Sequence, residues 1–95
     1  MKRSAMLFAM LALCSSMVFA QEGATVFKSK CAICHGPNGE GKIGPKLQGT
    51  SVPESNIVSM LTQGNAAKKS PHNKPLAGLT ADQAKAVAAY VKSLK

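Results

Sequence analysis

The sequence contains few aromatic, acidic and cysteine residues. Aromatic residues make up 4% of its 95 residues, and there are four acidic residues and three cysteines. Proteins that bind single-stranded nucleic acid stack its bases on aromatic side chains, so this scarcity argues against that class. A small secreted domain held together by disulfides normally has four or more cysteines, which excludes a disulfide framework. No stretch alternates apolar and polar residues with a period of two, and we therefore expect no β-sheet.

Basic residues, in contrast, are plentiful. Twelve Lys and Arg side chains against four acidic ones give a formal net charge of +8. The basic residues are spread singly or in pairs along the chain and do not form one block. Such a surface either keeps the protein soluble or steers it toward an acidic partner, because charge chiefly sets the rate of association.

The N-terminal segment has the organisation of a secretory signal peptide. The positive residues Lys2 and Arg3 precede an apolar run over 5–19 that is interrupted by two serines. A cleavage site is expected between Ala20 and Gln21, because small residues are preferred before the cleaved bond.

The sequence therefore predicts a cleaved signal peptide over 1–20 and one mature domain over 21–95. A retained transmembrane anchor is a first alternative, although the apolar run is short for a span of ~20 residues. Lipid attachment at Cys14 is a second alternative, but Leu13 precedes it where a small residue is expected.

The mature domain needs a stabilising group. A domain this short buries a thin core, and a disulfide, metal or cofactor usually supplements it. Cys14 leaves with the signal peptide, so Cys31 and Cys34 are the cysteines of the mature domain. The stabilising group should be one that these two residues bind.

Helices are predicted in three segments of the mature domain: 22–32, 51–64 and 80–94. Apolar residues recur in the last two at the three- and four-residue spacing of an amphipathic helix. The segments 36–50 and 65–79 are loops, because glycine and proline are frequent in the first and two prolines interrupt the second. Loops this long in a small domain suggest that they enclose something.

The two later helices also have recognisable ends. Ser51 with Glu54, and Thr80 with Gln83, have the spacing of a capping box, in which two side chains satisfy free backbone N–H groups. Gly64 follows the second helical pattern as a C-terminal cap.

Cys31-Ala32-Ile33-Cys34-His35 is the signature for covalent attachment of a c-type haem. The two thiols can add across the two vinyl groups of one haem, and the adjacent His35 can bind the iron. A thiol oxidoreductase and a zinc site formed with His72 are alternatives. The first needs strands that the sequence does not predict, and adjacent Cys34 and His35 are awkward ligands for one tetrahedral zinc ion.

The mature chain resembles the class I c-type cytochromes. Gly23, Phe27 and Tyr90 are similar to the residues at which that family's first and last helices cross. The segment 44–47 resembles its Gly-Pro-x-Leu motif, whose proline, here Pro45, accepts a hydrogen bond from the proximal histidine. The resemblance implies an all-α, cytochrome c-like fold with about three helices wrapped around one covalent haem c.

The sequence departs from that family at the sixth iron ligand. The family usually supplies a methionine from the loop before the last helix, and no methionine is present in 65–95. An alignment without gaps puts His72 in that position, which makes His72 the expected sixth ligand. With a gap of one residue the position falls to Asn73, leaving the iron open or weakly ligated. Met60 is the third candidate, although its helical neighbours place it in the core.

These observations predict a periplasmic electron carrier and not an enzyme. A second imidazole would lower the reduction potential of the haem, whereas a thioether would raise it. An iron with an open sixth position would favour a sensor or small-ligand binder instead. We expect a monomer that binds neither nucleic acid nor membrane after signal cleavage. Its partners would be redox proteins with acidic docking surfaces, met by lysines beside the haem-binding segments: Lys28, Lys30, Lys42, Lys46, Lys68, Lys69 and Lys74.

Overall fold

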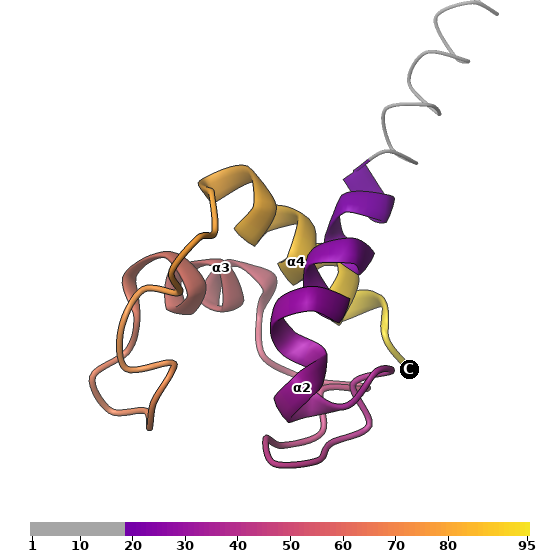
Figure 1. Cartoon of the computed structure of the whole chain (residues 1–95), viewed down its shortest axis with the longest axis horizontal. Coiled ribbons are helices and arrows are strands. Elements are labelled where there is room, and N and C mark those ends of the chain that lie inside the picture. The colour runs from indigo at the N-terminus through magenta and orange to yellow at the C-terminus, as the bar shows by residue number, and fades with distance from the viewer. Residues whose placement is uncertain (1–18) are drawn as a thin grey trace, which may run out of the picture.

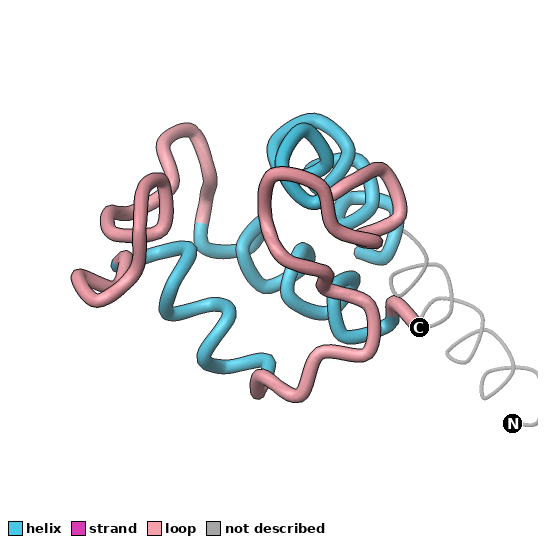
Figure 2. The backbone as a smooth tube through the Cα atoms, turned by 90° about the horizontal axis from the view of Figure 1, so that it is seen from below, coloured by secondary structure: helices cyan, strands magenta, loops and turns pink. Residues whose placement is uncertain are grey.

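A computed structural model describes residues 19–95, which are all-α (Figure 1). The first helical region comprises residues 19–26, a π-helical turn η1 (Phe27–Cys31) and helix α2 (Ala32–His35). Helices α3 (Glu54–Gln63) and α4 (Ala81–Ser93) follow. Within these residues there is no strand, as predicted. The two long loops, pink in Figure 2, connect the helical regions.

The predicted signal peptide falls mostly on residues 1–18, which lie outside the described residues. In the part of the chain that is described, no helix has both the length and the apolar character needed to cross a membrane.

The first helical region differs from the prediction of one continuous helix over 22–32. The backbone widens to π-helical hydrogen bonding over Phe27–Cys31 and returns to α-helix over Ala32–His35. A π-helical turn inserts a residue into the helix and is frequent at functional sites. Here the turn ends at Cys31, so the helix extends further than predicted and includes the whole Cys-x-x-Cys-His motif.

The start of α3 also differs from the prediction. The expected capping box between Ser51 and Glu54 is absent, and Pro53 occupies the N-cap position with no side-chain cap bond. The Pro53 carbonyl accepts hydrogen bonds from the N–H groups of Asn56 (3.0 Å) and Ile57 (3.2 Å). The helix therefore begins at Glu54, directly after Pro53, and Ser51 lies too far before it to act as a cap.

The start of α4 is as predicted. The hydroxyl of Thr80 accepts a hydrogen bond from the Gln83 backbone N–H at 3.1 Å, and the Gln83 side chain accepts one from the Thr80 N–H at 2.9 Å. This complete capping box satisfies two backbone N–H groups that would otherwise have no partner.

The first helical region crosses α4 at Gly23. A β-carbon at Gly23 would overlap the carbonyl oxygen of Ala86, so only glycine allows this approach. One turn further along, the rings of Phe27 and Tyr90 pack with their centroids 5.2 Å apart. Helix α3 packs against α4 from another side. The core formed by these contacts consists of Val26, Phe27, Ile57, Leu61, Ala84, Val87, Ala88 and Val91.

Substitution of Gly23 by Ala tests this crossing. Helix propensity alone would favour Ala by about 1 kcal/mol. Because the new methyl group would have to push α4 away, we expect a net decrease of about 1–3 kcal/mol in the free energy of unfolding. Denaturant unfolding of the haem-loaded protein measures the change, and T25A, at an exposed neighbouring position, should stay within about 0.5 kcal/mol of the wild type. A G23A variant that is more stable than the wild type would contradict the close crossing.

Candidate functional site

The residues of the Cys-x-x-Cys-His motif lie in the first helical region. Cys31 ends the π-helical turn, and Cys34 and His35 lie in α2. Neither cysteine forms a disulfide, and both are partly buried. His35 is buried, with 8% of its surface exposed. The helical turn thus brings two thiols and one imidazole together within five consecutive residues.

The ring of His35 is held by the loop that follows it. The Nδ1 atom of His35 lies 2.7 Å from the carbonyl oxygen of Pro45, which is the contact that the Gly-Pro resemblance implies. A carbonyl oxygen can only accept a hydrogen bond, so Nδ1 carries the proton and donates the hydrogen bond. The other ring nitrogen, Nε2, then keeps its lone pair and can bind a metal ion.

Gly44 also fixes this ring, a role that sequence reasoning did not assign. A β-carbon at Gly44 would lie 2.8 Å from Cε1 of the His35 ring and 2.9 Å from its Nδ1. The N–H of Gly44 donates to the Cys34 carbonyl at 2.6 Å, which ties the loop to α2. In the sequence, the glycine immediately before Pro45 is the only hint of this role. The structure shows that the His35 ring occupies the space that a side chain at position 44 would need.

The ring of His72 lies close to that of His35. The ring centroids are 6.1 Å apart and the planes are inclined by 28°. Metal–imidazole bonds are about 2 Å long, so two imidazoles on opposite sides of one metal ion have their centroids about 6 Å apart. The separation therefore fits one metal ion between the two rings.

The surroundings of His72 favour its neutral form. Partial burial lowers the pKa of His72, and the neighbouring His35 and Lys68 lower it further. A lowered pKa favours the neutral imidazole, which is the form that binds metal ions.

The other two candidates for a sixth ligand lie elsewhere. Met60 is partly buried against the core, and it lines a cavity of about 360 Å³ together with Asn56, Ser59, Gly64, Asn65 and Ala66. Asn73 is exposed. Of the three candidates, His72 is the one whose ring lies close to that of His35, with the two centroids 6.1 Å apart.

The surroundings of Cys31 argue against the thiol oxidoreductase alternative. Burial raises the pKa of the Cys31 thiol to about 11, and nearby Lys30 offsets only part of that effect. Reactive cysteines have lowered pKa values, since the thiolate is the nucleophile.

The zinc alternative also lacks support in the geometry. Among residues 19–95, no three His, Cys, Asp or Glu side chains converge as a metal-binding group. A structural zinc site requires four such ligands. The two thiols and the two neighbouring imidazoles thus fit haem, a group that carries its own metal-binding nitrogens.

Comparison with known proteins agrees with this chemistry. Residues 19–91 match the profile of the family described as "Cytochrome C oxidase, cbb3-type, subunit III". A relative from Synechocystis sp., described as "Cytochrome c-553-like", is 38% identical over 47 residues, which are 47% of this chain and 45% of the relative. The match therefore spans less than half of that relative's length. No solved structure matches the chain.

Proposed function

Since the chain belongs to the c-type cytochrome family described as "Cytochrome C oxidase, cbb3-type, subunit III" and therefore binds a covalent c-type haem, we propose that it is an electron carrier. We propose that the mature domain over 21–95 shuttles single electrons between redox proteins in the periplasm. The predicted signal peptide over 1–20 supports the location. The iron would have two histidine ligands, His35 and His72.

The residues of the site fit the haem. The thiols of Cys31 and Cys34 would form the two thioether bonds, and Nε2 of His35 would bind the iron on one side. The haem supplies one-electron chemistry at its iron. The protein holds the proximal ring still in both redox states, through the Pro45 carbonyl and the contact with Gly44. An electron carrier benefits from this rigidity, because little rearrangement accompanies each transfer.

The distance of 6.1 Å between the rings of His35 and His72 is the observation that carries the proposal. Two neutral imidazoles would keep the iron six-coordinate and close it to small ligands. They would also place the reduction potential below that of a cytochrome with one histidine and one methionine, since a thioether stabilises ferrous iron. We therefore propose a low-potential carrier.

Replacement of His72 by Met tests the ligand directly. H72M would introduce the thioether of ordinary members of the class, so the reduction potential should rise by more than roughly 100 mV, within the range of about 0.8 V that axial ligands span. A spectroelectrochemical titration of the purified protein measures the change.

The matched control for this experiment is N73M, which introduces the same thioether at the neighbouring position. Its potential should equal that of the wild type. A rise in N73M without one in H72M would show that the loop presents Asn73, and not His72, to the iron.

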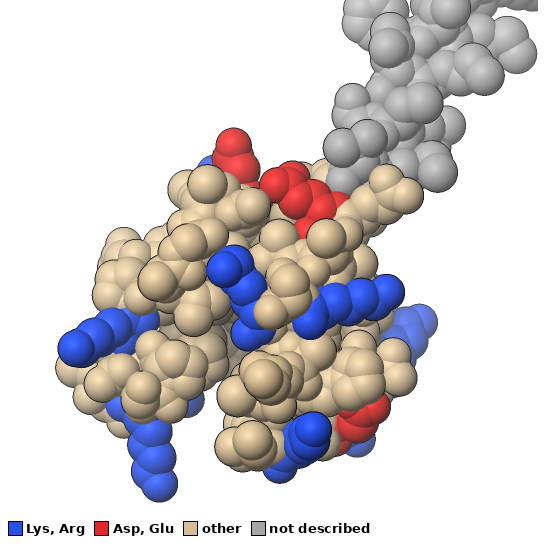
Figure 3. Space-filling view, viewed as in Figure 1, with Lys and Arg blue, Asp and Glu red and all other residues tan. Residues whose placement is uncertain are grey.

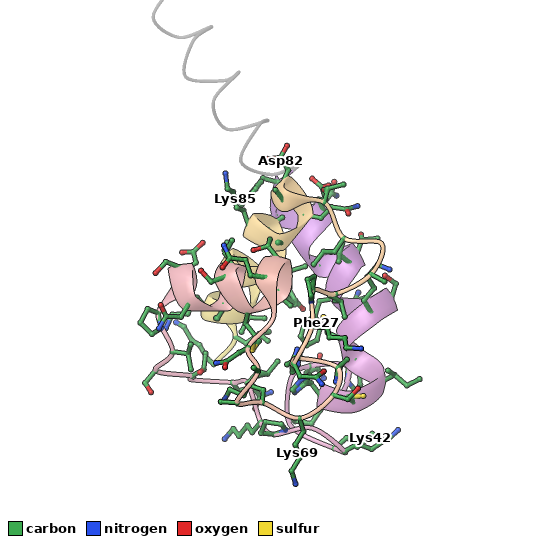
Figure 4. The ribbon with its side chains drawn as sticks, turned by 90° about the vertical axis from the view of Figure 1, so that its left-hand side faces the viewer. Phe27, Lys42, Lys69, Asp82 and Lys85 are labelled. Carbon is green, nitrogen blue, oxygen red and sulfur yellow. The ribbon has the colours of Figure 1, made fainter. Side chains whose placement is uncertain are left out.

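The distribution of charge supports docking by the end of the molecule that holds the haem. Lysines are scattered over the face in Figure 3, and acidic side chains are few. Lys42 and Lys69 lie at one end of the molecule in Figure 4, with Lys85 and Asp82 at the other. Lys42 belongs to the loop that holds His35, and the Lys69 carbonyl accepts a hydrogen bond from the His72 N–H at 3.0 Å. We propose that lysines at this end meet acidic surfaces of redox partners in a small, transient interface.

Charge reversal at the two ends distinguishes local steering from a general effect of net charge. At an ionic strength of about 0.1 M, K69E should slow oxidation by the anion ferricyanide at least about twofold, because exposed charges then act only within a Debye length of about 10 Å. The same variant should react faster with the cation hexaammineruthenium(III). Stopped-flow kinetics measure both rates.

K85E makes the same change of charge at the opposite end, and its effect on both rates should be smaller. Equal effects of K69E and K85E would mean that the lysines act only through net charge, and would contradict the docking surface.

A further inference from the structure

His72 lies in a loop over 65–79 that has no helix of its own. A ligand on a loop binds a metal ion well only if other contacts already order the loop. Otherwise the conformational entropy lost on ordering the loop reduces the net free energy of ligand binding. Two hydrogen bonds provide this restraint, one to the end of α3 and one within the loop itself. Leu76 donates its N–H to the Leu61 carbonyl at 3.0 Å, and Asn65 donates its N–H to the His72 carbonyl at 2.7 Å.

Gly64, at the end of α3, lies close to the backbone of the loop at Lys74. Its φ angle is +76°, and its N–H donates to the Met60 carbonyl at 2.9 Å, as expected of a helix C-cap. A β-carbon on Gly64 would lie 2.6 Å from Cα and 2.8 Å from N of Lys74. Real β-carbons do not approach a backbone this closely, and a backbone cannot rotate away as a flexible side chain can.

We propose that Gly64 is a positioning residue for the sixth ligand: its missing side chain lets the backbone at Lys74 lie against the end of α3, and this holds His72 against the iron. The inference rests on the proposed ligation by His72. The inference adds that the contact between Gly64 and Lys74, two residues after His72, decides whether the sixth position of the iron is open or closed. A side chain at position 64 would move Lys74, and His72 with it, and would open the sixth position to small ligands.

The test compares G64A with G49A in the haem-loaded protein. Gly49 also has a positive φ angle, +70°, but a β-carbon there would have no atom within 4 Å. Both variants therefore place a side chain at a positive φ angle, and only G64A introduces the clash with Lys74. The measurements are the ferric absorption spectrum, which reports spin state, and the affinity of the ferrous protein for carbon monoxide.

We expect G64A to acquire a high-spin component and to bind carbon monoxide at least about tenfold more tightly than the wild type, because apparent affinity rises in proportion to the open fraction. G49A should match the wild type in both measurements. In an H72A background, G64A should have no further effect on carbon monoxide binding, because the ligand that it displaces is already absent.

A milder variant keeps the test decisive if G64A does not accumulate as folded protein. The side-chain Oδ1 of Asn65 accepts a hydrogen bond from the Ala67 N–H at 3.0 Å and so stabilises the first turn of the loop. N65A should raise carbon monoxide affinity in the same direction by a smaller factor. Carbon monoxide affinity that does not change in G64A or N65A, or that rises equally in G49A, would overturn the inference.

These outcomes separate the inference from the proposed function. If the wild-type ferric protein is already high-spin and H72A does not alter it, then His72 is not a ligand, and the proposed ligation fails. If the wild type is low-spin and H72A opens it, but G64A behaves as G49A does, then the ligation stands and the role of Gly64 is refuted.

Discussion

The fixed orientation of the His35 imidazole is the constraint on which the rest of the structure depends. The Pro45 carbonyl accepts a hydrogen bond from Nδ1 of His35 at 2.7 Å, and Gly44 leaves room for the edge of the ring. These contacts leave Nε2 with a free lone pair, and the ring of His72 lies nearby, with its centroid 6.1 Å from that of His35. The proximal side is thus built by two segments that are adjacent in sequence, which makes it local and rigid.

The opposite side of the site is built differently. His72 lies far along the chain from His35, in a loop that has no helix of its own. Contacts with the end of α3 hold this loop in place. Ordering such a loop costs conformational entropy, which the hydrogen bonds to Asn65 and Leu61 and the close packing at Gly64 offset. The two histidines are therefore held in different ways: His35 is fixed by its immediate neighbours in sequence, whereas the position of His72 depends on a tertiary contact.

Much of this arrangement was predictable from the sequence, because the signals are local. The Cys-x-x-Cys-His motif, the glycine-rich loop over 36–50 and the Thr80–Gln83 capping box each depend on residues within a few positions of one another. The crossing of Gly23 with α4, and the packing of Phe27 on Tyr90, followed from the resemblance to class I c-type cytochromes.

The features that the sequence did not predict depend on backbone geometry. A π-helical turn has no residue signature that separates it from an α-helix, so Phe27–Cys31 was predicted as ordinary helix. Ser51 and Glu54 have the correct spacing for a capping box, but the Pro53 carbonyl takes the first hydrogen bonds of α3 instead. Gly64 was recognised as a helix cap, and its contact with Lys74 could be seen only once the loop was placed.

The central claim is that one haem iron is bound between His35 and His72. Low-temperature electron paramagnetic resonance of the purified ferric protein, recorded beside H72A, tests it most directly. The account predicts a low-spin signal typical of two imidazole ligands in the wild type and its loss in H72A. A high-spin or water-ligated signal that is the same in both proteins would contradict it, and would mean that the iron is open on the side of the loop.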